Sequence, residues 1–185
     1  MKQVANPAEV KIAVCGHRSL SDPHQLQAGI LNVAERIQKI LPDQQYHIWS
    51  CLAEGADRLI THILVKTLAA ELTVVLPLPE PQYLEDFQTN ESIQEFNDLK
   101  QLAGKIIEPD HKLLRPHAYQ AANLTLIKNC ALLVAIWDGK PARGPGGTGE
   151  MVEMSRQAGI PLLWIHLSGG PGIGYLTEER IENLP

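Results

Sequence analysis

The sequence has few of the features that mark membrane, disulfide-rich or secreted proteins. No apolar run approaches the length needed to cross a bilayer, and residues 1–7 lack the apolar stretch of a signal peptide. The three cysteines, Cys15, Cys51 and Cys130, lie in apolar segments without CxxC spacing. They indicate reduced, mostly buried thiols. We therefore expect a cytoplasmic protein with no membrane association.

Signals for metal or general nucleic-acid binding are also missing. The seven histidines show no HExxH or paired ligand spacing, so no metal site and no required cofactor are predicted. Magnesium that enters with a phosphate ligand would leave no sequence signature. The net charge is −5 and no cluster of Lys and Arg stands out, which lowers nucleic-acid binding in rank.

What is present is the pattern of a globular α/β protein. Its 185 residues suit a single domain, 1–185, large enough to bury about 70% of its unfolded surface. Short apolar runs alternate with helical periodicity, which predicts a mostly parallel sheet covered by helices.

The periodicity also places the individual elements. Strands are expected at 10–15, 46–52, 72–76, 105–107, 130–137 and 160–167, and helices at 26–40, 56–68, 117–129 and 149–159. The segment 81–104 breaks the alternation and has helical character; a connection this long often covers a site, but packing alone also explains Phe87 and Phe96. The tail 168–174 reads as a loop without GxGxxG spacing.

The most informative run is Pro145–Glu153, which follows an apolar strand and opens a helix. Glycines at such a turn let backbone N–H groups approach a ligand, and a helix N-terminus favours an anion. We therefore expect a phosphate at Gly146, Gly147 and Thr148. The alternative is a glycine-rich loop without a ligand.

Polar residues and glycines gather where the predicted strands end. They are Gly16, His17 and Arg18 after the first strand, Glu54, Gly55, Asp57 and Arg58 after the second, and Trp137, Asp138 and Gly139 after the fifth. Because ligands bind beyond the carboxyl ends of parallel strands, this convergence predicts a pocket.

Each of these side chains has a ligand role and a plainer alternative. Arg18 offers a planar fork for phosphate beside Gly16, and His17 can donate to phosphate, move a proton or serve a structural role. Glu54 is suited to accept both ribose hydroxyls, whereas Asp57 also complements the helix dipole.

An aromatic ring is expected to stack on a base. Trp137 and Tyr83 are the candidates, although Trp137 can equally cap the core. Asp138–Gly139 belongs either to the pocket or to a bare turn. Glu150 and Glu153 share a helix face, where paired carboxylates bind ribose, orient a water molecule or complement the dipole.

Four short pieces of the sequence resemble the SLOG superfamily in their order and spacing. This superfamily includes the DprA/Smf proteins and the LOG cytokinin-activating enzymes, and the resemblance is greatest to its uncharacterised bacterial branch related to YpsA. The pieces are Val14–Arg18, Ala53–Asp57, Trp137–Gly139 and Gly146–Thr148. The resemblance implies a Rossmann-like three-layer sandwich, a nucleotide or nucleotide derivative at the glycine turn, and self-association into dimers or larger assemblies.

LOG enzymes cleave the N-glycosidic bond of nucleoside monophosphates with a Pro-Gly-Gly-x-Gly-Thr-x-x-Glu signature and an upstream arginine. The chain keeps Pro145, Gly146, Gly147, Gly149 and Glu153. It has Glu150 in place of the threonine. The arginine's place falls near Ala122 or Asn123, in a helix without arginine, so Arg18 or Arg115 would have to replace it.

Three functions follow in order of preference. The first is a nucleotide-binding sensor or carrier in which Glu54 and Glu153 contact ribose. The second is a LOG-like phosphoribohydrolase in which Glu153 stabilises the ribosyl cation or activates water. The third, from the DprA side of the resemblance, is binding of single-stranded DNA, which the acidic balance opposes.

Overall fold

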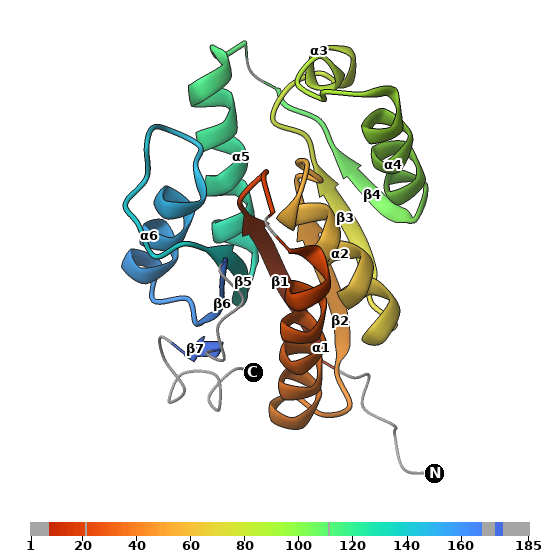
Figure 1. Cartoon of the computed structure of the whole chain (residues 1–185), viewed down its shortest axis with the longest axis vertical. Helices are drawn as coiled ribbons and strands as arrows, with labels where there is room; N and C mark the ends of the chain where they lie inside the picture. Colours follow the sequence, from red (N-terminus) through yellow and green to blue (C-terminus); the bar gives the residue numbers. More distant parts are fainter. Residues whose placement is uncertain (1–7, 21, 111, 168–172, 176–185) are drawn as a thin grey trace.

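The computed structural model describes residues 8–20, 22–110, 112–167 and 173–175. These residues form one seven-stranded sheet in the order β4-β3-β2-β1-β5-β6-β7 (Figure 1). The strands are β1 (Glu9–Gly16), β2 (Gln45–Ser50), β3 (Glu71–Val75), β4 (Ala103–Ile107), β5 (Leu132–Trp137), β6 (Leu162–His166) and β7 (Ile173–Tyr175). All neighbouring pairs are parallel except β6 and β7, which are antiparallel.

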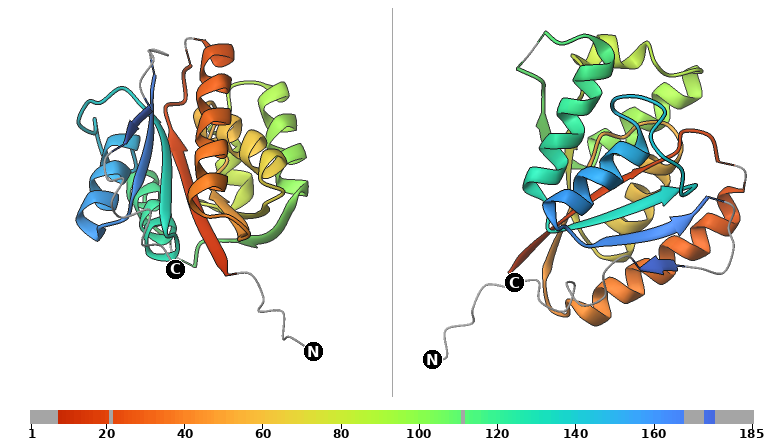
Figure 2. Two further views of the ribbon diagram at one scale, coloured as in Figure 1. Left: turned by 90° about the horizontal axis from the view of Figure 1, so that it is seen from below. Right: turned by 90° about the vertical axis from the view of Figure 1, so that its left-hand side faces the viewer.

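Helices cover both faces of this sheet. They are α1 (Pro23–Ile40), α2 (Ala56–Thr67), α3 (Glu80–Leu84), α4 (Asn90–Gln101), α5 (Arg115–Asn129) and α6 (Thr148–Ala158). Figure 2 shows α1, α2 and α4 on one face and α5 and α6 on the other. The expected α/β, Rossmann-like three-layer sandwich with a mostly parallel sheet is confirmed. No helix among the described residues is long and apolar enough to span a membrane.

Burial explains why these segments form these elements. Every residue of β5 is buried, as expected for a central parallel strand with helices on both faces. One core cluster joins the sheet to α1 and α2, with Ile30 and Leu64 fully buried. A second cluster joins the other face of the sheet to α5 and α6, with Leu126 and Met151 almost completely buried.

The predicted elements are present with small differences at their ends, and one prediction is wrong. Residues 173–175 form β7, although the sequence predicts a loop there. This strand is short and glycine-containing, and it forms by pairing with β6, which no local propensity reports. The rest of the predicted tail loop, residues 168–172, lies outside the described residues.

The chain changes direction across the sheet at β1. From β1 it adds β2, β3 and β4 on one side, and then crosses to place β5 and β6 on the other. Such a switch point leaves a crevice beyond the carboxyl ends of the two strands that flank it. A ligand site is therefore expected between the ends of β1 and β5.

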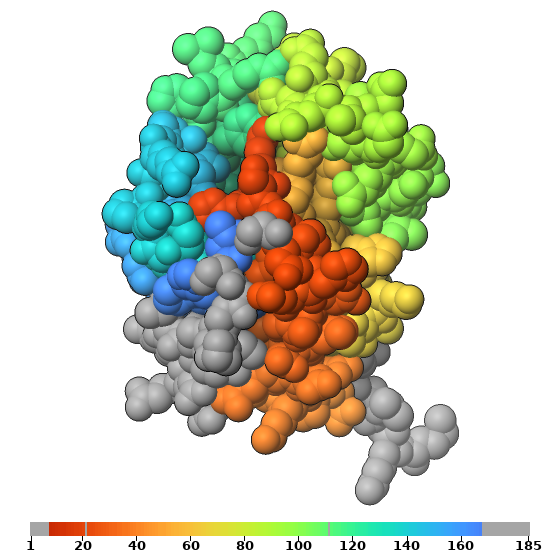
Figure 3. Space-filling model, in the orientation of Figure 1, coloured from red at the N-terminus to blue at the C-terminus, as the bar shows by residue number. Residues whose placement is uncertain are grey.

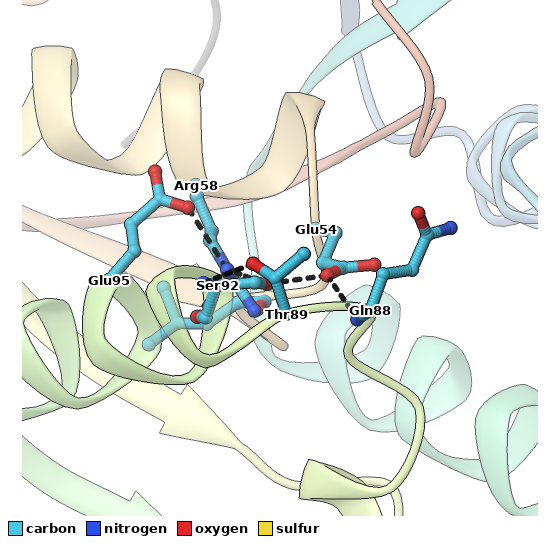
Figure 4. Close-up of polar contacts among 7 residues, drawn as sticks. Glu54, Arg58, Gln88, Thr89, Ser92 and Glu95 are labelled. Atoms are coloured by element: carbon cyan, nitrogen blue, oxygen red, sulfur yellow. Dashed lines mark hydrogen bonds and ion pairs between the residues drawn. The ribbon is translucent and has the colours of Figure 1, made fainter.

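A buried arginine fastens α2 to the α3–α4 segment (Figure 4). Arg58 is 1% exposed; its Nε donates to the Leu52 carbonyl at 3.0 Å and its Nη1 to the Ser92 carbonyl at 2.8 Å. The same Nη1 contacts Glu95 Oε2 at 3.0 Å, and the Phe87 ring centre lies 4.3 Å from the guanidinium carbon. The segment 81–104 is thus held by packing and polar ties.

The turn after β2 contains a strained backbone conformation at Leu52, which a hydrogen bond from Arg58 stabilises. Leu52 is buried with φ of 53°, a left-handed conformation uncommon for leucine. Its N–H donates to Ser50 Oγ at 3.0 Å, and its carbonyl accepts from Arg58. The path of the chain from β2 into α2 is therefore fixed by side chains on both sides of the turn.

Replacing Arg58 with Met should lower the free energy of unfolding by about 3 kcal/mol, because the Leu52 and Ser92 carbonyls lose a charged donor. Glu95→Gln is the matched control: the Glu95 side chain is 59% exposed, so its loss should cost less than about 1 kcal/mol. Urea denaturation of both variants measures the difference. Equal costs would show that Arg58 does not hold the segment.

Candidate functional site

A cavity of about 250 Å³ lies at the switch point, beyond the carboxyl ends of β1, β2 and β5. Its lining divides into a buried floor and an exposed rim. The floor consists of Cys15, Cys51, Asp57, Asn123, Trp137 and Met151, and the exposed charges of the rim include Arg18, Lys140 and Arg143. Figure 3 shows the segment after β1, in red, at the surface between the α5–α6 half of the molecule and the α2–α4 half.

A contact made mostly of backbone brings the ends of β1 and β2 together. The Ala56 N–H donates to the His17 carbonyl at 3.0 Å. A Cβ on Gly16 would lie 2.3 Å from Ala56 Cβ, and one on Gly55, where φ is +82°, would lie 2.0 Å from the Arg18 carbonyl oxygen. Both glycines are therefore required for α2 to begin directly beside the segment after β1.

The glycine turn presents the start of α6 to the cavity. Gly147 is the N-cap of α6 and supplies no side-chain cap. The N–H groups of Glu150 and Met151 reach the Gly147 carbonyl, while those of Thr148 and Gly149 have no hydrogen-bond partner in the described part of the chain. Two unpaired donors at a helix N-terminus suit an anion.

The glutamate inside this turn supports the turn itself. Glu150 Oε2 accepts the Gly146 N–H at 2.6 Å, and its other oxygen accepts from the Gln120 side chain. Gly146 has φ of +80°, and a Cβ there would lie 2.4 Å from Tyr119 Cβ. The turn is thus packed against α5 and tied to its own helix.

Arg18 reaches the rim beside Tyr119. Its Nη2 donates to Tyr119 Oη at 3.2 Å, and its guanidinium carbon lies 5.6 Å from the centre of the ring. The Tyr119 hydroxyl donates to Asp86, and burial, followed by this bond, raises the pKa of Tyr119. Tyr119 is the one hydrogen-bond partner of Arg18 among the described residues, which leaves guanidinium donors available.

Asp57 is the titratable carboxyl group of the floor. Burial raises its pKa to about 7, although the backbone N–H groups of Gly16 and Ala53 oppose the shift. Near neutral pH this group can give or take a proton. Burial also raises the pKa of the Cys15 and Cys51 thiols, so both are neutral and poor nucleophiles.

His17 and Asp138 form a polar pair at the rim. His17 Nε2 lies 3.2 Å from both the backbone nitrogen and Oδ1 of Asp138, so it accepts the N–H when unprotonated and faces the carboxylate when protonated. The Lys140 N–H is the main cause that lowers the pKa of Asp138. Lys140 Nζ and Arg143 Nη2 each lie 4.0 Å from Asp138 Oδ2, with side chains 71% and 86% exposed.

The structure brings most of the predicted site residues together. Those that line the cavity are Gly16, His17, Arg18, Asp57, Trp137, Asp138, Gly146, Gly147 and Thr148. Those that lie outside its lining are Glu54, Gly55, Tyr83, Gly139, Glu150 and Glu153.

Tertiary partners account for the outlying residues from the first half of the chain. Glu54 accepts the Gln88 N–H at 3.0 Å and the Ser92 hydroxyl (Figure 4), and these bonds lower the pKa of Glu54 against the effect of burial, which raises it. Tyr83 is fully buried, and its hydroxyl donates to the Cys51 carbonyl at 3.0 Å. Tyr83 therefore has no face toward a ligand.

In the second half of the chain, the candidate residues outside the cavity lining make contacts near the surface of the protein. Glu153 is on the exposed face of α6, 3.6 Å from Arg156 Nη1. Arg115, considered above as a replacement cation, contacts Asp86 at 2.6 Å and lies outside the cavity lining. Trp137 lines the floor, but its indole N–H donates to the Lys140 carbonyl at 2.8 Å and its ring packs on Trp164.

Several lining residues were not singled out from the sequence. They are Asn123, Tyr119, Lys140, Arg143 and Met151. Asn123 lies on the buried face of α5 with Ala118, Ala122 and Leu126, but this helix is only weakly amphipathic, so the sequence pattern does not reveal that face. No group of His, Cys, Asp and Glu in the described ranges is arranged to hold a metal ion.

Gly16→Ala should destabilise the fold by about 1–3 kcal/mol, because its Cβ would overlap Ala56. Gly147→Ala is the matched control, since the nearest atom to its Cβ, the Gly144 carbonyl oxygen, is 3.4 Å away. That control should change the free energy of unfolding by less than about 1 kcal/mol. Thermal and urea unfolding provide the comparison, and equal effects would contradict the steric requirement at Gly16.

Asp57→Asn should remove one pH dependence of stability. Between the ordinary value of 3.8 and about 7, folded Asp57 holds a proton that the unfolded chain has lost. The free energy of unfolding of the wild type should therefore fall, relative to the variant, as pH rises through this window. Urea titrations of both proteins from pH 4 to 8 measure the difference; parallel curves would refute the raised pKa.

Comparisons with known proteins place the fold among solved structures. No family model matches the chain, and no curated protein matches it. The X-ray structure of TM1055, a structural genomics target, is 16% identical with a TM-score of 0.52, covering 93% of this chain and 88% of TM1055. A Moco carrier protein from Chlamydomonas reinhardtii is 14% identical with a TM-score of 0.50, covering 85% and 76%. The chain therefore shares a Rossmann-like fold with both.

Proposed function

We propose that this protein binds a nucleotide or a related phosphate-bearing small molecule and acts as a sensor or carrier of it. The observation that carries the proposal is the start of α6, which brings two unpaired N–H groups to the rim of a cavity at the switch point. The phosphate would lie against the turn of Gly146, Gly147 and Thr148.

The charges of the rim support an anionic ligand. Arg18, Lys140 and Arg143 all line the cavity, and Asp138 is the rim carboxylate that opposes them. The contacts of Lys140 and Arg143 with Asp138 are long and solvent-exposed, so both side chains can turn to a ligand at little cost. Arg18 offers planar donors suited to phosphate oxygens.

One of the two fold neighbours supports a small-molecule ligand. It is named as a carrier protein, of Moco, and it shares the Rossmann-like sheet. We also propose that the chain belongs to the SLOG superfamily. Membership would account for the order in which the segment after β1, the segment after β2 and the glycine turn follow one another along the chain.

The rival hydrolase has weaker support from the geometry. Glu153, its expected acid, lies on the exposed face of α6, and Glu150 is bound to the Gly146 N–H. Asp57 would then be the remaining acid on the cavity floor. Binding without turnover therefore needs fewer additional assumptions.

Gly147→Asp should abolish nucleotide binding while keeping the fold. An aspartate at this N-cap favours the helix but places a carboxylate where the phosphate would bind. Gly147→Ala is the control: its Cβ has room, it carries no charge, and it has no side-chain oxygen to occupy the Thr148 and Gly149 N–H groups, so it should keep most of the binding. A ligand at 100 times its Kd adds about 2.7 kcal/mol of stability, which a thermal-shift screen detects.

The screen should include inorganic phosphate, nucleoside mono- and triphosphates and Moco, with chromatography of each hit for released base. Stabilisation by an intact nucleotide, lost in Gly147→Asp alone, is the expected result. Released base would make the protein a hydrolase. If no phosphate compound stabilises the wild type, the proposed function is wrong.

A further inference from the structure

The cavity floor contains a buried polar side chain without a partner. Asn123, on α5, is 8% exposed and lines the cavity. Its carboxamide makes no hydrogen bond with any described residue. The carboxamide atoms of Asn123 are not among the side-chain atoms that are fully enclosed without a partner, so they are accessible from the cavity. A ligand on the floor would supply the missing partners.

The other floor residues limit what that ligand can be. The neutral thiols of Cys15 and Cys51 are weak hydrogen-bonding groups, and the Trp137 N–H is already bonded to a carbonyl. Asp57 is the second strong polar group of the floor. Any polar part of a ligand that reaches the floor must therefore be matched by Asn123 and Asp57.

The charges of the floor and the rim indicate that the two ends of the ligand differ in charge. The floor carries an acid and no cation, so a phosphate placed there would be a buried anion without a counter-charge, which is strongly unfavourable. The cations Arg18, Lys140 and Arg143 all lie at the rim. The anionic end must stay at the rim, and a neutral polar end must occupy the floor.

Hydroxyl groups fit that neutral end best. A hydroxyl both donates and accepts, which matches the donors and acceptor of a carboxamide and the acceptor oxygens of a carboxyl group. The volume of about 250 Å³ lies below the usual range of about 300–1,000 Å³ for sites that enclose drug-sized ligands. It is suited to a sugar and its phosphate, with a base left at the rim near Tyr119.

We infer that the cavity encloses the sugar phosphate part of its ligand, with Asn123 bonded to the sugar hydroxyls. This inference rests on the proposed function and adds the orientation of the ligand. Phosphate binds at the turn of Gly146–Thr148, and the sugar points down to α5. Asn123 then distinguishes a hydroxylated ligand from an apolar phosphate ester.

Calorimetric titration of the full chain with three probes tests this orientation: inorganic phosphate, ribose 5-phosphate, and phenyl phosphate, which carries an apolar ring in place of the sugar. In the wild type, ribose 5-phosphate should bind at least tenfold more tightly than either other probe. In Asn123→Leu that advantage should disappear, while the affinity for inorganic phosphate stays unchanged.

The variants should fold, because Asn123 makes no hydrogen bond with a described residue that the substitution would break, and leucine has a similar shape. Melting curves check this, and Asn123→Ala provides a second, smaller substitution. Equal binding of ribose 5-phosphate by wild type and folded variants would overturn the role of Asn123. If the wild type binds ribose 5-phosphate no more tightly than inorganic phosphate, the proposed orientation of the sugar is wrong, but the phosphate site is not contradicted. If all three probes fail while a nucleotide stabilises the wild type in the thermal-shift screen, the enclosed sugar phosphate is wrong and the proposed function stands; if nucleotides fail as well, both proposals are wrong.

Discussion

The close contact between the end of β1 and the start of α2, made mostly of backbone, fixes how the two segments meet at the site. Gly16 and Gly55 have no Cβ, and the backbone of one segment therefore touches the backbone and Ala56 methyl of the other. This closeness brings His17 and Arg18 to one side of the cavity and Asp57 to its floor. A small increase in side-chain volume here would separate the two strands that share the cavity.

Polarity is divided between floor and rim for a physical reason. The floor lies between α2 and α5 and is closed by buried side chains, so a carboxyl group there has a raised pKa and thiols stay neutral. The rim is formed by loops open to solvent, where cations can remain charged without a partner. Arg58, outside the cavity, holds the turn after β2 through the Leu52 carbonyl and ties α2 to α4 through the Ser92 carbonyl.

The fold and the strand-end residues could be predicted because both follow from local pattern and parallel topology. Gly16, His17, Arg18, Asp57 and Asp138 lie at the ends of strands that any parallel arrangement brings to one edge. The remainder depends on tertiary partners, which local pattern does not report. Glu54 is drawn away by Ser92, and Tyr83 is packed among other aromatic rings.

The lining residues that the sequence did not single out come from two helices, α5 and α6, and from the loop between β5 and α6. Lys140 and Arg143 reach the rim because the loop folds back, with the Lys140 carbonyl on the Trp137 indole and the chain at Ala142 against Gly149. Asn123 lies one helical turn after Tyr119, on a helix whose weak amphipathicity hides its inner face.

The contact between positions 16 and 56 also limits how such a chain can change over time. The two residues share one small volume, with a Cβ at position 56 filling the space that position 16 leaves empty. Glycine at position 56 would remove only one obstacle to alanine at position 16, because a Cβ at position 16 would still lie 2.8 Å from the Ile136 carbonyl oxygen. Among chains that build this same contact, position 16 should therefore remain glycine, while a small residue at position 56, 40 residues away along the sequence, fills the space beside it.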